Sequence, residues 1–322
     1  MISVAMATYN GEKYLPVQLD SILNQTIQDF EIVICDDCSR DSTRKILEDY
    51  AKLDSRIKVY LNETNLGFKK NFEKAISLCS GDYVALSDQD DIWLPEKLEK
   101  SLMCIESTGV DLVCTNALLV DGEGKSLGST MMKDVLAFDY VSENPDSQLM
   151  YLCQKTIVQG STVLAKKAFV QSCLPIPDSF KFHDKWLGLK AACTKGIRYV
   201  TDETLLYRQH GSNQTTNDTR NIFTDLKVTK TTARDLENEA QVESDLKYVL
   251  DNFELNETQK KIVSDSYEYL TVHLKKKDWK YFSYFAKNYD NLTFQKSAVK
   301  KAIVLTKKFL GMFIRIKKKI HG

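Results

Sequence analysis

Four short apolar segments alternate with amphipathic helical patterns over the first hundred residues, and this alternation constrains the fold more than any other feature. The predicted strands cover residues 2–7, 31–35, 57–61 and 83–86. Each interval is long enough for one helix that returns the chain to the same end of a sheet. We therefore predict an α/β fold with a mostly parallel, Rossmann-like sheet that is covered by helices on both faces.

Polar side chains follow three of these strands at the point where each strand ends. They are Thr8, Tyr9 and Asn10 after the first, Asp36 and Asp37 after the second, and Asp88, Asp90 and Asp91 after the fourth. The carboxyl ends of parallel strands share one edge of a sheet, and ligands of open α/β sheets bind there. We expect these groups to line one crevice.

The residue types in this crevice fit a nucleotide diphosphate. Asp88 and Asp90 can converge on one hard divalent cation, Mg²⁺ or Mn²⁺, whose oxygen shell a ligand's phosphates would complete. A tyrosine ring such as Tyr9 can stack on a base, and a carboxylate can accept the imide N–H of uracil or thymine. The alternatives are a solvated acidic turn, a packed loop aromatic and a helix N-cap at Asp36 or Asp37. Neither G-x-G-x-x-G nor G-x-x-x-x-G-K-[ST] occurs, which argues against dinucleotide and P-loop chemistry.

Charge is distributed unevenly along the 322 residues. Nine of the 44 basic residues and none of the 44 acidic residues follow position 290, so residues 1–290 hold 35 basic residues and a net charge of −9. An acidic body of this kind argues against nucleic-acid binding. The eight cysteines lack a second closely spaced pair beyond Cys35 and Cys38, so we expect free thiols in a reducing compartment. No run of about 18 apolar residues predicts a membrane span.

Four segments together resemble the family 2 glycosyltransferases of the GT-A fold, in their bacterial rhamnosyltransferase-like form. The segments read A-T-Y-N-G, V-I-C-D-D-C-S-R-D, N-L-G-F-K-K-N-F and L-S-D-Q-D-D-I-W-L-P. The resemblance covers residues 1 to about 215, which we take as the catalytic domain. It implies a site in which Tyr9 and Asp37 hold the base, Asp90 binds the metal and Asp88 lies near the ribose and metal. The further donor-binding residues that it implies are Thr8, Asn10, Asn65, Gly67 and Lys70.

The second half of this domain is expected to hold the acceptor side. Residues 110–120 and 158–164 have strand patterns, whereas residues 125–155 are weakly patterned and predict a mobile loop. Asp184 falls in the first turn of a predicted helix. From the residues alone, we would interpret it as an acidic side chain that stabilises the helix through the helix dipole. The resemblance implies instead that Asp184 is the general base. It also implies that His210, in Y-R-Q-H-G-S-N, ligates the metal or touches the diphosphate and that Arg208 offsets leaving-group charge.

The resemblance implies an inverting, metal-dependent transfer from a nucleotide diphosphate sugar, with dTDP-L-rhamnose as the favoured donor. The acceptor would be a glycan or a polyprenyl-linked sugar in bacterial surface polysaccharide synthesis. A UDP-hexose donor is the main competitor. Alternatives of other classes are a non-catalytic module that binds a sugar nucleotide or polysaccharide and, more weakly, a nucleotidyltransferase.

The remaining chain is predicted to be helical. Residues 216–290 form a helical extension, in which residues 235–253 and 257–275 have long helical patterns and Asn256 with Gln259 predicts a capping box. Residues 291–322 read as a basic amphipathic helix that lies on the inner face of the cell membrane, so we expect a cytoplasmic, peripheral protein. The alternative is a docking helix that packs on the domain or on an oligomer partner, such as the second copy in a homodimer.

Overall fold

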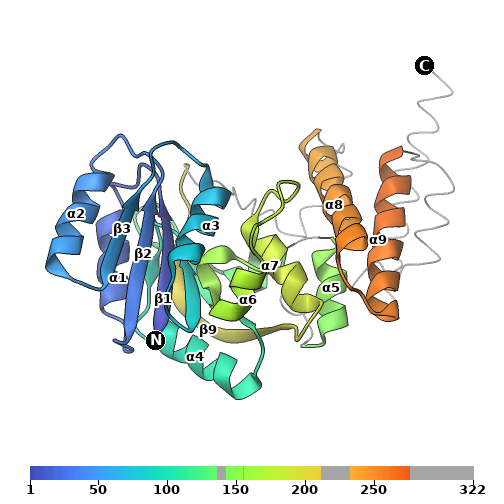
Figure 1. Ribbon diagram of the computed structural model, residues 1–322, viewed down its shortest axis with the longest axis horizontal. Helices are drawn as coiled ribbons and strands as arrows, with labels where there is room; N and C mark the ends of the chain where they lie inside the picture. The colour runs from blue at the N-terminus through green and yellow to red at the C-terminus, as the bar shows by residue number, and fades with distance from the viewer. Residues whose placement is uncertain (136–142, 155, 212–232, 276–322) are drawn as a thin grey trace. The chain divides into compact units, whose positions relative to one another are not determined.

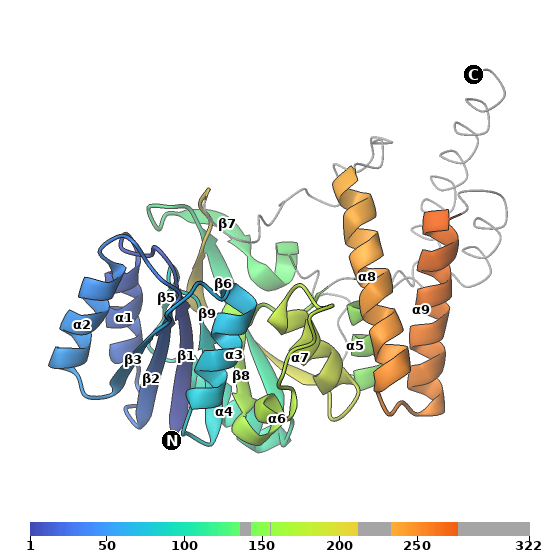
Figure 2. The same cartoon turned by 45° about the horizontal axis from the view of Figure 1, so that its top comes forward.

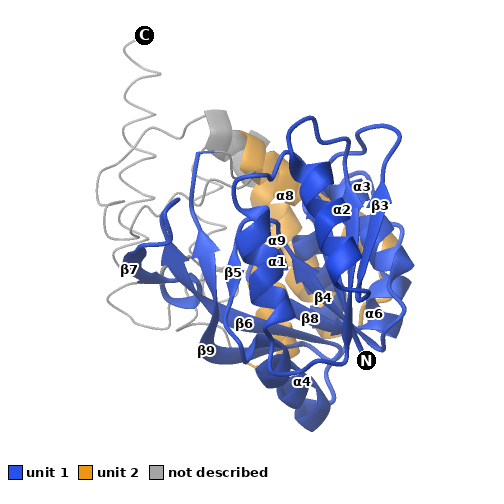
Figure 3. Cartoon of the chain, turned by 90° about the vertical axis from the view of Figure 1, so that its left-hand side faces the viewer, with its two compact units in different colours: residues 1–139, 156–218 blue, residues 140–155, 219–322 orange. Residues whose placement is uncertain are grey.

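The structure is a computed structural model that describes residues 1–135, 143–154, 156–211 and 233–275. The chain divides into two compact units, which Figure 3 colours separately. The first unit contains residues 1–139 and 156–218, and the second contains residues 140–155 and 219–322. Residues 140–155, which lie within the catalytic domain proposed from the sequence, thus belong to the second unit.

Strands and helices alternate through the first unit, as Figure 1 shows. In chain order they begin with β1 (Ile2–Thr8), α1 (Leu15–Leu23), β2 (Phe30–Asp36), α2 (Thr43–Leu53), β3 (Ile57–Leu61), α3 (Phe68–Leu78), β4 (Tyr83–Ser87), β5 (Ile92–Trp93) and α4 (Lys97–Thr108). They continue with β6 (Leu112–Val120), β7 (Ser126–Thr130), a π-helix (Met131–Val135), a 3-10 turn (Gly160–Thr162), β8 (Val163–Lys166), α6 (Lys167–Ser172), α7 (His183–Ala192) and β9 (Ile197–Arg208).

One nine-stranded sheet connects these strands in the order β3-β2-β1-β4-β8-β6-β9-β5, and β7 pairs with β6. β1 is parallel to β2 and β4, β2 is parallel to β3, and β6 is parallel to β9. β8 runs antiparallel between β4 and β6, and the short β5 runs antiparallel to β9. The predicted α/β fold with a mostly parallel sheet is therefore confirmed.

Alternating side chains of the central strands bury both faces of the sheet. On one face, Ile2, Val4 and Met6 of β1 join a core with residues of α1, α2 and α4. On the other face, α3 contacts β1 and β2 and buries Phe72 and Ile76. Figures 1 and 2 show α3 on the opposite side of the sheet from α1 and α2. These two layers fix the carboxyl ends of β1, β2 and β4 at a common edge.

The expectation of a loop over residues 125–155 is wrong for the part that the structure describes. That part contains β7, the π-helix and α5 (Pro145–Leu152). β7 escaped prediction because its Ser126, Leu127 and Gly128 are exposed and give no apolar pattern. The strand expected at residues 158–164 starts later, at Val163, because the 3-10 turn precedes it.

The second unit contains α5, α8 (Ala233–Asn252) and α9 (Glu257–Lys275), with α9 packed against both of the others. The predicted capping box precedes α9: the Asn256 N–H donates to Gln259 Oε1 (3.2 Å), and the Gln259 N–H donates to Asn256 Oδ1 (2.9 Å). No helix within the described residues is both long and apolar enough to cross a bilayer. The basic helix expected at residues 291–322 lies outside the described residues.

Candidate active site

A cavity of about 880 Å³ opens at the carboxyl ends of β1, β2 and β4. The loops after these strands, the first turns of α3 and α7 and the residues that follow β9 form its wall. Ten residues proposed from the sequence line it: Thr8, Tyr9, Asn10, Asp37, Asn65, Gly67, Asp88, Asp90, Asp184 and His210. A volume of this order suits a ligand as large as a nucleotide sugar.

Two carboxyl groups in this cavity have pKa values above the usual range for aspartate. Burial, together with the negative charges of Asp90 and Asp184, raises the pKa of Asp88 to about 7. Burial likewise raises the pKa of Asp184 to about 6, although the backbone N–H groups of Lys185 and Gly160 act in the opposite direction. The carboxylates of Asp88, Asp90 and Asp184 repel one another because little solvent screens their charges. Binding of a proton or of a cation at this site would reduce that repulsion.

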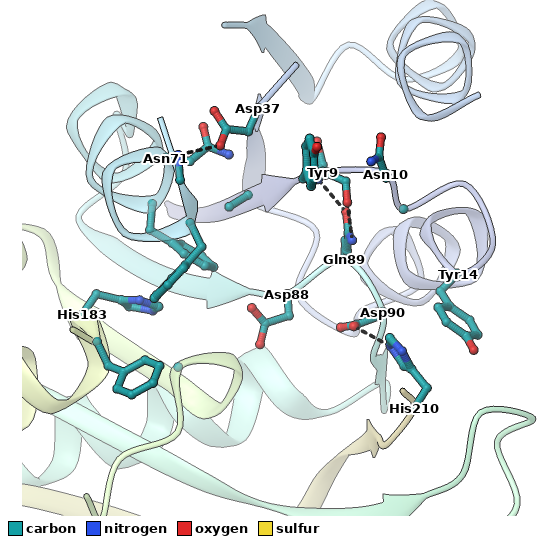
Figure 4. Close-up of a pocket in the computed structure, with 18 of the residues that line it drawn as sticks. Tyr9, Asn10, Tyr14, Asp37, Asn71, Asp88, Gln89, Asp90, His183 and His210 are labelled. Atoms are coloured by element: carbon teal, nitrogen blue, oxygen red, sulfur yellow. Dashed lines mark hydrogen bonds and ion pairs between the residues drawn. The ribbon is translucent and has the colours of Figure 1, made fainter. Parts of the chain in front are cut away.

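Asp90 is paired with His210, which follows the last strand of the sheet. Nε2 of His210 lies 2.8 Å from Oδ2 of Asp90, and Figure 4 shows the pair beside Asp88. The imidazole also contacts the ring of Tyr14, with 4.8 Å between centroids. The structure thus brings together the metal-binding residues proposed from the sequence, although they come from segments 120 residues apart.

Carboxylate oxygens and an imidazole nitrogen are suitable ligands for Mg²⁺ or Mn²⁺, and the proximity of the Asp88 and Asp90 carboxyl groups favours a cation. Among the described residues, no three His, Cys, Asp or Glu side chains form a group that could hold an ion. Asp88, Asp90 and His210 would leave room in the shell of an ion for other ligands, such as phosphate oxygens.

Arg208 lies behind the acidic loop and does not line the cavity, in contrast to the role expected for it. Its N–H donates to Asp91 Oδ1 (3.0 Å), its Nε donates to the Asp90 carbonyl (2.8 Å), and its guanidinium lies 4.6 Å from the centre of the Tyr14 ring. The residue is 5% exposed. In this arrangement Arg208 fixes the loop that carries Asp90.

The carboxylate of Asp37 organises the turn that precedes α3. Its oxygens accept the N–H of Leu66 (2.7 Å), the N–H of Gly67 (2.8 Å) and the side-chain amide of Asn62 (2.8 Å). A carboxylate has about four acceptor positions, so one position on Oδ2 is left for a ligand. Asp37 is 3% exposed and lines the cavity.

Tyr9 stands at the rim of the cavity and is 44% exposed, as a platform for a base would be. Its backbone N–H donates to Gln89 Oε1 (2.9 Å), and Gln89 Nε2 donates to its carbonyl (3.1 Å). The middle residue of D-Q-D thereby joins the acidic loop to the loop after β1. Figure 4 shows these two bonds.

Three other proposed residues have contacts within the protein. The Thr8 hydroxyl donates to Asp36 (3.2 Å), and Asn10 Oδ1 accepts the N–H of Arg40 (2.9 Å), so both shape the wall. Nζ of Lys70 lies 3.1 Å from Glu73, and Lys70 does not line the cavity. Its proposed role in donor binding has no support from its position.

Several cavity residues were not found by sequence reasoning. They are Tyr14, Phe68, Asn71, Phe72, Gln89, Gln159, Gly160, Phe182 and His183. Phe68, Asn71, Phe72 and Gln89 lie inside the segments that carry the family resemblance, and this position is the only signal that could have marked them. Lys69 of α3 was also missed: its Nζ donates to the carbonyls of Pro177 (3.1 Å) and Phe180 (2.8 Å) and so holds the segment before α7.

This fold and this site define a glycosyltransferase of the GT-A class. Residues 3–172 match the family model described as glycosyl transferase family 2, and the chain belongs to this family. The chain is 31% identical over 216 residues to the dTDP-rhamnosyl transferase RfbG of Shigella flexneri, an alignment that covers 65% of this chain and 73% of RfbG. It is 34% identical over 122 residues to the UDP-Glc:alpha-D-GlcNAc-diphosphoundecaprenol beta-1,3-glucosyltransferase WfgD of Escherichia coli. That alignment covers 38% of this chain and 47% of WfgD.

Solved structures support the same fold. TarS of S. aureus in complex with UDP-GlcNAc has a TM-score of 0.58 and 19% identity, with 91% of this chain and 81% of that chain covered. The mannosyltransferase PcManGT of Pyrobaculum calidifontis, in complex with GDP-Man and Mn²⁺, has a TM-score of 0.55 and 15% identity, with 95% and 78% covered. At these identities the likeness establishes the fold alone.

Proposed function

We propose that this glycosyltransferase moves a hexosyl group, with L-rhamnose from dTDP-L-rhamnose as the favoured donor, to a glycan or lipid-linked acceptor, and inverts the anomeric configuration. One observation carries the proposal. A single cavity holds the base-stacking candidate Tyr9, the acidic pair Asp88 and Asp90, and the proposed base Asp184. A nucleotide diphosphate sugar has a base, a diphosphate and an anomeric carbon, and each of these parts has a proposed partner in this cavity.

Asp184 is the proposed general base. The acceptor oxygen attacks the anomeric carbon as the bond from that carbon to the diphosphate oxygen breaks, and the hydroxyl proton passes to the Asp184 carboxylate. The nucleotide diphosphate leaves, and no covalent enzyme intermediate forms. Burial raises the pKa of Asp184 to about 6, which makes its carboxylate more basic while keeping it mostly ionised above neutral pH.

Asp90 and His210, with Asp88 beside them, are the residues that would hold Mg²⁺ or Mn²⁺. A bound ion would supply positive charge to the departing diphosphate. The ten lining residues support the donor-site proposal, whereas Lys70 and Arg208 do not line the cavity and so lend it no support.

The rhamnosyl preference rests on the similarity to RfbG and on the S-D-Q-D-D-I-W segment. The similarity to WfgD favours a UDP-hexose as the competing donor. The chain's place in bacterial polysaccharide synthesis, together with the diphosphoundecaprenol-linked acceptor of WfgD, supports an acceptor on a lipid carrier. We further propose that residues 291–322 bind the inner membrane surface, where such an acceptor would be found.

A donor panel tests this proposal. Purified protein is incubated with Mn²⁺, free and lipid-linked glycans, and one donor at a time: dTDP-L-rhamnose, UDP-glucose, UDP-GlcNAc or GDP-mannose. We expect acceptor-dependent release of dTDP and a product with inverted configuration by NMR. If turnover occurred only with a UDP-sugar, dTDP-L-rhamnose would be rejected as the donor and that UDP-sugar would be assigned instead. Nucleotide sugar binding without turnover under any condition would instead support a non-catalytic module.

A further inference from the structure

Lys13 is the only lysine or arginine among the described residues that line the cavity. It follows the loop after β1 and comes just before α1. Its side chain is 63% exposed, so the ammonium group is accessible to a ligand. Four aspartates line the same cavity, and a nucleoside diphosphate is itself an anion. Lys13 is therefore the one positive side chain that the described lining offers to such a ligand.

The contacts of Lys13 bring its ammonium group to the end of the cavity that holds the proposed metal-binding residues. Nζ lies 4.7 Å from the centre of the Tyr14 ring. Tyr14 in turn contacts the ring of His210, and Nε2 of His210 lies 2.8 Å from Asp90. Figure 4 shows Tyr14, His210 and Asp90 side by side. A diphosphate bound beside Asp90 and His210 would lie on the side of the cavity where Lys13 stands.

The ion pair that Lys13 makes within the protein is weak enough to be exchanged for a ligand. Nζ lies 3.5 Å from Oε1 of Glu123, which is longer than an ordinary hydrogen bond of about 2.7–3.2 Å. The side chain of Glu123 is 85% exposed, and exposed ion pairs contribute little to stability. The flexible stem of a lysine can carry the ammonium group from Glu123 to a phosphate oxygen without movement of the backbone.

The transfer reaction itself requires positive charge at this place. When the bond between the anomeric carbon and the diphosphate breaks, its electron pair stays on the diphosphate oxygen, which gains negative charge. An ammonium group that donates to the diphosphate stabilises this state more than the intact donor. The guanidinium of Arg208 is occupied elsewhere, because it donates to the carbonyls of Asp90 (2.8 Å) and Gly122 (2.9 Å).

We propose that Lys13 binds the diphosphate of the donor and offsets the negative charge of the departing nucleoside diphosphate. The inference deepens the proposed function and rests on it. The segment after β1 would then hold the donor at two points, the base at Tyr9 and the diphosphate at Lys13.

Calorimetric titration with dTDP and with UDP, in the presence of Mn²⁺, tests this role. Lys13→Met keeps an unbranched apolar stem and removes the charge. We expect it to bind the preferred nucleoside diphosphate about tenfold more weakly than wild type, and kcat of the transfer to fall as well. Lys13→Arg retains the charge and should stay within about threefold of wild type. Added salt should weaken binding by wild type more than binding by Lys13→Met, because salt screens exposed charges.

Two further variants separate diphosphate binding from surface effects. Lys45→Met removes an exposed lysine that pairs with Asp49 (2.8 Å) and does not line the cavity, so its affinity should equal that of wild type. Glu123→Gln frees the ammonium group of Lys13, so its affinity should be unchanged or higher.

Wild-type affinity of Lys13→Met would overturn the inference and leave the proposed function standing. Equal losses in Lys13→Met and Lys13→Arg would also overturn it, because charge would not be the cause. So would an equal loss in Glu123→Gln, since the ion pair and not the free ammonium group would then support binding. If the wild-type protein binds neither dTDP nor UDP and turns over no donor, the proposed function falls with the inference.

Discussion

The side-chain amide of Gln89 satisfies both backbone groups of Tyr9, with bonds of 2.9 and 3.1 Å between residues 80 positions apart. A Cβ at Gly11 would lie 2.3 Å from Gln89 Oε1, so the amide fills the space that Gly11 leaves. The loop proposed to bind the base and the loop proposed to bind the metal are thereby joined through one residue.

Replacement of Gln89 by Leu should weaken donor binding. The variant loses both bonds to Tyr9, and we expect the donor KM to rise about fivefold to fiftyfold, in line with the loss of one or two hydrogen bonds. Steady-state kinetics at saturating acceptor measure this. Gln89→Glu keeps the acceptor of the pair and should show an intermediate effect. An unchanged donor KM in the Leu variant would show that donor binding does not depend on the bonds between Gln89 and Tyr9.

Asp90→Asn should abolish turnover and weaken binding of nucleoside diphosphate in the presence of Mn²⁺. The Asn side chain is neutral and a poorer ligand for a hard cation, while the loop is held from behind by Arg208. Calorimetry with and without EDTA gives the metal-dependent part of the affinity, which the variant should lose. Asp49→Asn, on the exposed face of α2, is the matched control. Full activity of Asp90→Asn in excess EDTA would rule out the metal role.

Asp184→Asn should lower kcat by roughly 100-fold or more, with little change in donor affinity, because the amide cannot accept the proton. In the wild-type protein, activity should fall as pH drops below about 6, where the Asp184 carboxylate becomes protonated. This acid limb should be absent from the residual activity of the variant. A kcat near that of wild type would place the base on another residue.

The same substitution should stabilise the protein at neutral pH. The Asp184 carboxyl has a pKa of about 6 in the folded state and 3.8 when unperturbed, so the folded state loses stability as pH rises from about 4 to 6. Asn cannot ionise, and we expect a gain on the order of 1–3 kcal/mol at pH 8 that disappears near pH 4. Thermal unfolding at both pH values measures it. Equal or lower stability of the variant at pH 8 would contradict the burial argument.

Deletion of residues 296–322 should release the protein from vesicles that contain anionic lipid and should preserve transfer to a soluble acceptor. The segment carries all nine basic residues that follow position 290, and each contributes about 1 kcal/mol near an anionic surface. Co-sedimentation at low and high salt is the measurement. Binding that survives the deletion, or its absence in the intact chain at low salt, would exclude the membrane role.

The first four strands and the location of the cavity could be predicted because they depend on local signals. Ile32, Val33 and Ile34 form a continuous apolar run, and the residues after parallel strands must meet at one edge. The orientation of Arg208 could not be predicted, since it depends on contacts with Asp90 and Asp91 from a distant segment. The role of Gln89 could not be predicted for the same reason, because its partner Tyr9 lies 80 residues away in the sequence.

The packing of α5 against α9 has a consequence for synthesis of the chain. Leu149 and Leu152 of α5 are fully buried in the finished protein, yet α9 begins 105 residues after Leu152. At a translation rate of about 5–20 residues per second, α5 leaves the ribosome roughly 5–20 seconds before α9. During that interval its apolar side lacks its helical partner, so α5 reaches its final packing only after α9 has been made.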